Sequence, residues 1–200
     1  MRTVTKLHSN FKHDCFVKEP KVIWLKEFHE DSFKKFVDDF EIALQIGQPI
    51  IPIVIDSYGG QIYSLNGMIS VIKSSPVPVA TILLSKAMSC GADLFTCGTE
   101  GYRYIAPYAT IMIHDAASGV WGKVEEVKSD AKETERLNDL GYEILAKNCG
   151  KPKDYFKNIV HEKGHADWFI DANEALKHNL ANHIGIPTFS VTARLDFELK

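Results

Sequence analysis

Apolar residues along the chain recur with two different periods, and the two patterns alternate. Short continuous apolar runs, such as 50–55 and 77–84, are typical of strands buried on both faces of a parallel sheet. The stretch 31–44 instead repeats apolar residues every three or four positions, which predicts an amphipathic helix with Asp31 or Ser32 as its N-cap. This alternation predicts an α/β fold. The expected strands are 21–25, 50–55, 77–84, 102–105 and 110–113, and the expected helices are 31–44, 62–73, 87–96, 122–148 and 171–179.

The longest helical pattern covers residues 122–148, and Gly150 and Pro152 mark its end. A helix of this length spans on the order of 40 Å. It either folds back over its own sheet or projects and buries its apolar stripe on another subunit. The pattern alone leaves both possibilities open.

Composition excludes several classes of protein. The chain has 200 residues, of which 45% are hydrophobic and 24% charged, as in an ordinary globular domain. The net charge of −3 gives no basic excess for binding nucleic acid. No apolar run approaches a membrane span, and the N-terminus lacks a signal-peptide pattern, so we expect a cytoplasmic protein. The four cysteines form no C-x-x-C and no zinc-like cluster with histidine, which predicts reduced, buried thiols.

Three residues at the ends of predicted elements carry candidate chemistry. Ser89 follows a buried run, His114 ends another, and Asp167 lies between apolar residues. Each has an ordinary structural explanation by itself: a helix cap, a core histidine and a turn residue. Together they supply a nucleophile, a base and an orienting carboxylate. The Gly59-Gly60 pair adds backbone N–H groups that can turn toward an oxyanion.

Four segments resemble, in order and spacing, the motifs of the Clp protease proteolytic subunit family, ClpP. The likeness runs from about residue 21 to residue 184, and the agreement of four motifs in register makes it specific. The segments are Asp56-Ser-Tyr-Gly-Gly60, Ala87-Met-Ser89-Cys-Gly-Ala92, Pro107-Tyr-Ala-Thr-Ile-Met-Ile-His114 and Asp167-Trp-Phe-Ile-Asp-Ala-Asn-Glu-Ala175.

The resemblance implies a serine endopeptidase. It carries over Ser89 as the nucleophile, His114 as the general base and Asp167 as the carboxylate that orients the base. It also implies that the backbone N–H groups of Gly60 and Cys90 form the oxyanion hole. This chemistry needs neither a metal nor another cofactor. The segment that the resemblance implies for binding substrate backbone contains Gly119, Val120 and Trp121.

The resemblance also implies an architecture and an assembly. The expected fold is the ClpP/crotonase-like fold of repeated ββα units, in which a handle at about 122–149 packs two heptameric rings face to face. Such a homo-oligomer degrades peptides and unfolded proteins in its chamber, normally with an ATP-dependent Clp unfoldase. We expect an N-terminal arm at 1–20, the peptidase domain at 21–190 and a tail at 191–200.

Several alternatives remain open at this point. Cys90, next to Ser89, is a second candidate nucleophile. The chain is otherwise a catalytically weak structural ring subunit, or a phage head-maturation protease of the same fold that acts in the host cytoplasm. A further alternative is a crotonase-fold enzyme acting on acyl-CoA thioesters, which uses backbone oxyanion donors without a Ser-His-Asp set.

Overall fold

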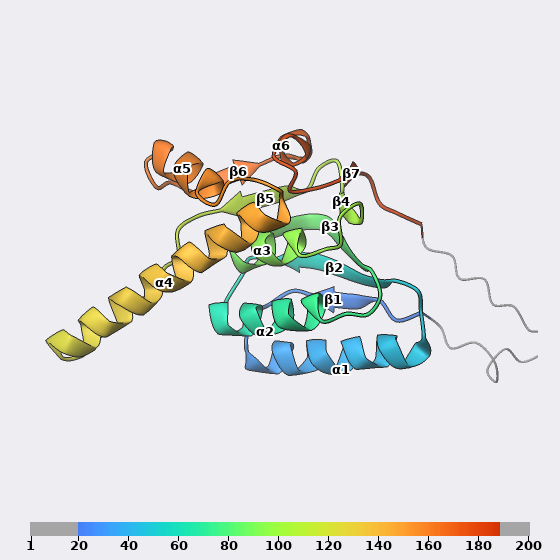
Figure 1. Ribbon diagram of the computed structural model, residues 1–200, viewed down its shortest axis with the longest axis horizontal. Coiled ribbons are helices and arrows are strands. Elements are labelled where there is room, and N and C mark those ends of the chain that lie inside the picture. The colour runs from blue at the N-terminus through green and yellow to red at the C-terminus, as the bar shows by residue number, and fades with distance from the viewer. Residues whose placement is uncertain (1–19, 189–200) are drawn as a thin grey trace, which may run out of the picture.

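A computed structural model describes residues 20–188 and contains one seven-stranded sheet, flanked by helices (Figure 1). The strands are β1 (Ile23–Leu25), β2 (Ile51–Ser57), β3 (Val79–Met88), β4 (Arg103–Ile105), β5 (Thr110–Ile113), β6 (Trp168–Ile170) and β7 (His183–Ile184). Their main order is β1-β2-β3-β4-β7, and all of these pairs are parallel. β5 pairs in parallel with the end of β3, and β6 pairs antiparallel with β5. The predicted α/β architecture is confirmed.

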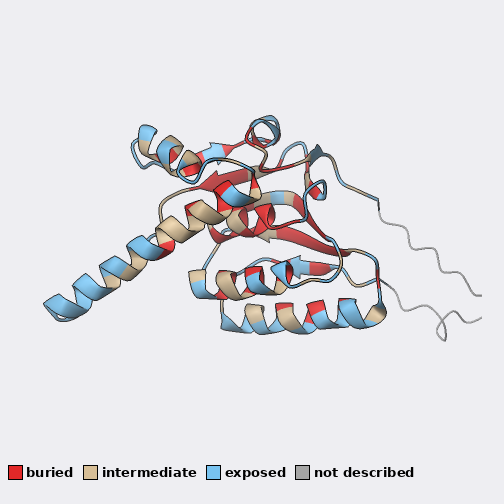
Figure 2. Cartoon of the chain, viewed as in Figure 1, coloured by how far each residue is buried: buried red, intermediate tan, exposed pale blue. Residues whose placement is uncertain are grey.

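Six helices lie around the sheet in the described part of the chain. They are α1 (Glu30–Ile46), α2 (Ile62–Lys73), α3 (Cys90–Thr96), α4 (Val124–Asn148), α5 (Tyr155–Glu162) and α6 (Ala172–Lys177). In Figure 1, α1 and α2 lie side by side along one side of the sheet, while α5 and α6 lie beyond β5 and β6. The central strands are therefore covered and almost wholly buried (Figure 2). This explains why β2 has the continuous apolar run of a strand buried on both faces.

The boundary between β3 and α3 differs from the prediction. The small apolar residues from 87 onward were expected to be helical, but β3 continues to Met88 and α3 begins at Cys90. The cause is tertiary: residues 86–88 pair with residues 110–112 of β5. Pairing with a neighbouring strand overrides the local preference of small residues for a helix.

The start of α1 also differs from the prediction. His29, rather than Asp31 or Ser32, is the N-cap. Its Nδ1 accepts a hydrogen bond from the Ser32 backbone N–H at 3.1 Å, and the Ser32 hydroxyl accepts one from the His29 N–H at 2.9 Å. This reciprocal pair is a capping box in which histidine takes the usual place of serine or threonine.

Three elements, α5, β6 and β7, are not among the expected ranges. β6 has three residues and exists through its pairing with β5, in which Ile113 lies opposite Trp168. A strand this short carries too few positions to show an alternating pattern. Its identification therefore needs the partner strand.

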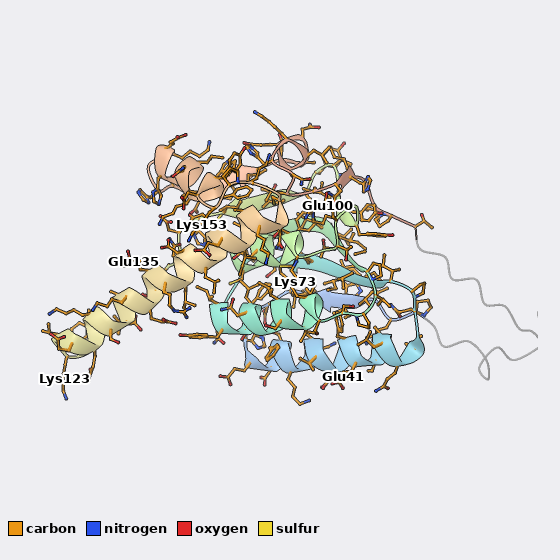
Figure 3. The ribbon with its side chains drawn as sticks, in the orientation of Figure 1. Glu41, Lys73, Glu100, Lys123, Glu135 and Lys153 are labelled. Atoms are coloured by element: carbon orange, nitrogen blue, oxygen red, sulfur yellow. The ribbon has the colours of Figure 1, made fainter. Side chains whose placement is uncertain are left out.

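The long helix α4 projects from the body, as the handle expectation required (Figure 1). Leu137 is its first buried residue, and Val124 near its start is 69% exposed. Charged side chains such as Lys123 and Glu135 lie along the same projecting half (Figure 3). The apolar positions of this half are consequently available to another molecule.

Most of the expected arm and all of the expected tail lie outside the described residues, as does Cys15. The three described cysteines, Cys90, Cys97 and Cys149, are free and buried. Within residues 20–188, no helix combines the length and the apolar character needed to cross a membrane.

Candidate active site

Ser89 is the single residue between β3 and α3, and its backbone has an unusual conformation. Its φ of 54° and ψ of −123° fall where non-glycine residues are rarely found. Such strain persists where the surrounding structure enforces it, here through a 2.9 Å hydrogen bond from the Ser89 N–H to the Met112 carbonyl. Within the described residues the hydroxyl makes no capping hydrogen bond to α3. The ordinary explanation of this serine as a helix cap therefore does not apply.

The pairing of β5 with β6 brings His114 close to Asp167. Ile113 lies opposite Trp168 in this antiparallel pair. His114, which follows Ile113, therefore faces Asp167, which precedes Trp168. The distance from His114 Nδ1 to Asp167 Oδ1 is 3.4 Å. Hydrogen bonds in active sites are often this long before substrate binds.

Ser89 and His114 line the same pocket. Apolar side chains, including Ile62, Leu65 and Ile113, form much of its wall. Within residues 20–188 the two side chains share this cavity, and no hydrogen bond joins the Ser89 hydroxyl to the His114 ring. The structure thus gathers the three candidate residues at one end of β3, β5 and β6.

The glycine pair after β2 approaches Ser89 closely. A Cβ atom on Gly59 would lie 2.8 Å from Ser89 Cβ, and one on Gly60 would lie 2.5 Å from the Phe28 carbonyl oxygen. Both glycines also have positive φ, of 105° and 152°. These positions therefore need glycine for conformation and for space.

Gly60 and Cys90 are in contact with each other. Cys90 Sγ donates a hydrogen bond to the Gly60 carbonyl oxygen at 3.2 Å. Cys90 also opens α3, where backbone N–H groups lack partners within the helix. The two residues implied for an oxyanion hole are therefore in contact with each other, and Cys90 directly follows Ser89.

The loop 56–60 is fixed by an ion pair at its start. Lys86 Nζ lies 2.6 Å from Asp56 Oδ1 and 4.4 Å from the centre of the Tyr58 ring. The lysine belongs to β3, so the contact ties the glycine loop to the strand that carries Ser89. The ring of a proline at position 58 would fix the backbone angle φ, and tyrosine does not. The contacts with Lys86 restrain the loop instead.

The Cys90 thiol is poorly suited to act as a nucleophile. Only 2% of the residue is exposed, and burial raises the pKa of the thiol to about 12. Cysteine reacts as the thiolate, which is scarce near neutral pH when the pKa is so high. Of the two neighbouring candidates, the geometry and the ionisation both favour Ser89.

The predicted substrate-binding residues Gly119, Val120 and Trp121 lie apart from this pocket. They belong to an exposed segment without regular structure between β5 and α4, and they are not among the residues that line the cavity. Their role stays a prediction.

One group of residues was missed entirely by sequence reasoning. The side chains of Asp115, His161 and His165 lie together in space. In the sequence, Asp115 follows His114, and His165 precedes Asp167 by two residues. The expectation of no zinc-like cluster concerned the cysteines, and this group contains none of them. The spacing of His161 and His165, four residues apart at the end of α5, was the available signal.

Asp93 in α3 lines the pocket that holds Ser89 and His114, and burial raises the pKa of its carboxyl to about 7. An unfolded aspartate has a pKa of about 3.9, so the folded state binds this proton more tightly. Stability should therefore fall as pH rises from about 4 to about 7. Asp93→Asn should raise the free energy of unfolding at pH 8 by on the order of 2 kcal/mol, with little effect at pH 4.5. Denaturant unfolding at a fixed protein concentration measures this, and an equal effect at both pH values would contradict it.

A comparison with known protein families identifies a match over most of the chain. The family model for Clp protease matches residues 10–187, which is most of the chain and extends beyond the region in which the resemblance was noted. The chain therefore belongs to the Clp protease family, and this membership implies serine peptidase activity.

Proposed function

We propose that the chain is a serine endopeptidase in which Ser89 is the nucleophile, His114 the general base and Asp167 the residue that orients it. The observation that carries the proposal is the position of the Ser89 hydroxyl, which makes no capping hydrogen bond to α3. It lies at a strained strand–helix junction and lines the pocket that His114 also lines. A strained junction of this kind exposes a nucleophile above the end of a sheet. The 3.4 Å contact between His114 Nδ1 and Asp167 Oδ1 supports the roles of base and orienting carboxylate.

In this mechanism the Ser89 hydroxyl attacks the peptide carbonyl while His114 accepts its proton. The C–O bond to Ser89 forms as the carbonyl becomes an oxyanion, which the N–H groups of Gly60 and Cys90 bind. The C–N bond then breaks, and His114 returns the proton to the leaving amine. Water repeats the sequence on the acyl-enzyme and releases Ser89. Asp167 stabilises the imidazolium form of His114 throughout.

The test is covalent labelling of the purified chain by a fluorophosphonate. Its phosphorus forms a bond to an activated serine oxygen, fluoride leaves, and the serine proton passes to the base. We expect one label per chain, located at Ser89 by peptide mass spectrometry. An unlabelled chain that still cleaves peptide would overturn the assignment. An unlabelled and inactive chain would indicate the structural ring subunit instead.

A second prediction concerns the oxyanion loop. Gly60→Ala places a Cβ about where the Phe28 carbonyl oxygen lies, at a φ that alanine rarely adopts, so the loop must move. We expect kcat for a short fluorogenic peptide to fall about 100-fold or more, because one oxyanion donor is displaced.

Gly101→Ala is the matched control for this prediction. Gly101 also has a positive φ, of 85°, but a Cβ there meets no atom within 4 Å. Alanine at this position is strained by the same kind of positive φ, and Gly101 does not line the pocket. Equal losses of kcat in the two variants would show that the effect is general strain rather than oxyanion geometry.

The proposed working form is a homo-oligomer of two stacked heptameric rings that encloses the sites. Support comes from the projecting half of α4 and the segment before it, where Trp121 is fully exposed and Val124 is 69% exposed. Apolar side chains of this size in a row are typical of a protein interface. Native mass spectrometry should give fourteen subunits, and a stable monomer that cleaves peptides would contradict the assembly.

Large protein substrates would need a Clp ATPase to unfold them, since folded proteins cannot enter such a chamber. Hydrolysis of an unfolded protein without any ATPase, but of a folded one only with it, is the expected result. Cleavage of a folded partner protein without an ATPase would instead favour the phage maturation role.

A further inference from the structure

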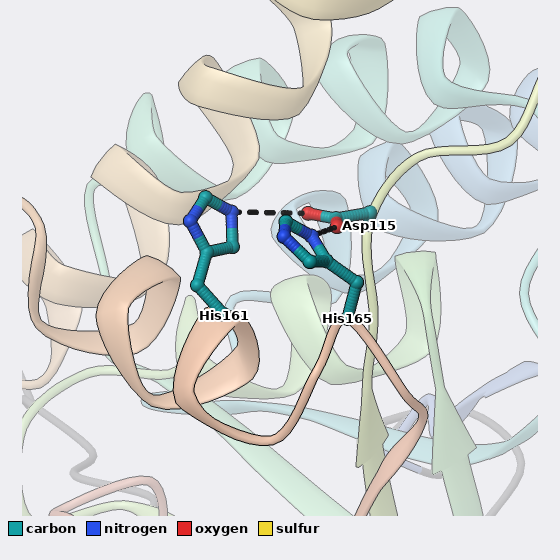
Figure 4. A group of neighbouring side chains, drawn as sticks. All are labelled: Asp115, His161 and His165. Atoms are coloured by element: carbon teal, nitrogen blue, oxygen red, sulfur yellow. Dashed lines mark hydrogen bonds and ion pairs between the residues drawn. The ribbon is translucent and has the colours of Figure 1, made fainter.

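Asp115, His161 and His165 converge from two separate segments of the chain (Figure 4). Asp115 follows β5, while His161 belongs to the last turn of α5 and His165 to the turn after it. His165 Nδ1 lies 2.7 Å from Asp115 Oδ2, and His161 Nε2 lies 3.9 Å from Asp115 Oδ1. The three ligand-type atoms all lie within 4.8 Å of one another.

We propose that these three side chains bind a divalent transition-metal ion such as Zn²⁺. Two imidazole nitrogens and one carboxylate oxygen are a typical ligand set for zinc, whereas Mg²⁺ and Ca²⁺ prefer oxygen ligands. Zinc bonds of about 2.0–2.1 Å in a tetrahedron separate ligand atoms by about 3.4 Å. The observed separations lie around this value, so small side-chain rotations suffice. Three protein ligands leave a fourth position for water or a substrate group.

The surroundings of Asp115 favour metal binding over a loose surface contact. Tyr142 donates a hydrogen bond to Asp115 Oδ1 at 2.9 Å, and the Asn138 side-chain amide donates another at 3.2 Å. Both donors belong to α4 and hold the carboxylate in place, as outer-shell partners do in metal sites. These two hydrogen bonds orient the Asp115 carboxylate toward the two histidines.

The site would fasten two segments that carry the candidate catalytic residues. Asp115 directly follows His114, and His165 precedes Asp167 by two residues. A metal bound between them ties the loop 162–167 to the end of β5, beside the 3.4 Å contact of His114 with Asp167. Its function would be to order that loop.

Metal binding does not depend on the peptidase proposal, and its test avoids activity as a readout. The full chain carrying Ser89→Ala is titrated with Zn²⁺ against a chromophoric chelator, and with Co²⁺ by visible absorbance. We expect one ion per chain. His161→Gln and His165→Gln should each weaken zinc binding by about 100-fold or more, since losing even an outer-shell partner costs 10–100-fold. Asp115→Asn, which keeps the shape of the side chain, should do the same.

His183→Gln is the matched control, because His183 is an exposed histidine on β7, which pairs with β4, and it is not part of the cluster. It should leave zinc affinity unchanged. Circular dichroism without metal confirms that each variant is folded. The proposal is overturned if no ion binds, or if the ligand variants bind zinc as tightly as the Ser89→Ala parent. It is also overturned if His183→Gln loses as much affinity as they do.

Hydrogen–deuterium exchange tests the fastening itself. Zinc should slow exchange of the backbone amides of residues 162–167 in the Ser89→Ala chain, but not in the same chain carrying His165→Gln. Unchanged exchange in both chains would overturn the proposed ordering of this loop.

Discussion

Ser89→Ala is expected to lower kcat for a short fluorogenic peptide by roughly 10⁴–10⁶-fold, which is the scale seen when a serine nucleophile is removed. The physical reason is that alanine cannot form the acyl-enzyme, while binding and the oxyanion donors remain. The small change in volume should leave folding intact, because the hydroxyl makes no capping hydrogen bond within the described residues. Steady-state kinetics at equal protein concentration measures the effect.

Two further variants make this result specific. Ser70→Ala removes a hydroxyl from the exposed face of α2, where it bonds to the Asn66 carbonyl, and should leave kcat unchanged. Cys90→Ala tests the neighbouring thiol, and it should keep most of the activity because the backbone N–H of residue 90 remains. If Ser89→Ala stayed active while Cys90→Ala did not, the nucleophile would be Cys90.

The second large effect concerns stability and centres on Arg103 in β4. Its guanidinium is 1% exposed and donates to the carbonyl oxygens of Asn148 at 2.7 Å and Asn179 at 3.1 Å. These carbonyls belong to the last residue of α4 and to the turn after α6. Two further bonds reach the Glu100 carboxylate at 2.7 Å and the Thr96 carbonyl oxygen at 3.4 Å. One side chain therefore satisfies backbone acceptors from segments far apart in the sequence.

Arg103→Met should lower the free energy of unfolding by about 3–5 kcal/mol. Methionine fills much of the volume but leaves the three backbone carbonyls without their charged donor. Arg103→Lys should lose less, because an ammonium group retains the charge but cannot fork to several acceptors. Denaturant unfolding monitored by circular dichroism measures both variants.

Glu100→Gln is the control for the charge pair. The Glu100 side chain is 66% exposed, so its ion pair with Arg103 should contribute no more than about 1 kcal/mol. If this variant destabilised the protein as much as Arg103→Met, the ion pair rather than the backbone contacts would be the main contribution.

Gly98 follows α3, which ends at Thr96 with Cys97 as the C-cap. Its φ is not positive, so the end of the helix does not require glycine for its backbone conformation. The space around it is the stronger constraint. A Cβ atom there would lie 2.4 Å from Thr81 Oγ1 and 3.0 Å from Arg103 Cγ. Local sequence cannot show such a contact, because both neighbours come from other strands.

The sequence by itself determined the elements with strong local patterns. The continuous apolar run of β2, the helical period of α1 and α2 and the length of α4 all have their cause within the segment, since burial sets the period. The sequence also placed Ser89 after a buried run and near the start of a helix, although the expected boundary at 87 was two residues before the serine. It did not show the positive φ of that junction, which depends on pairing with β5.

Tertiary structure decided how the candidate residues meet. The three-residue strand β6 pairs with β5, and this register, rather than any local pattern, brings Asp167 opposite His114. The same pairing brings the turn after α5 up to Asp115, which creates the His-His-Asp cluster. A pairing between distant segments is fixed by the summed contacts of the whole sheet, so a sequence read along one window carries no signal for it.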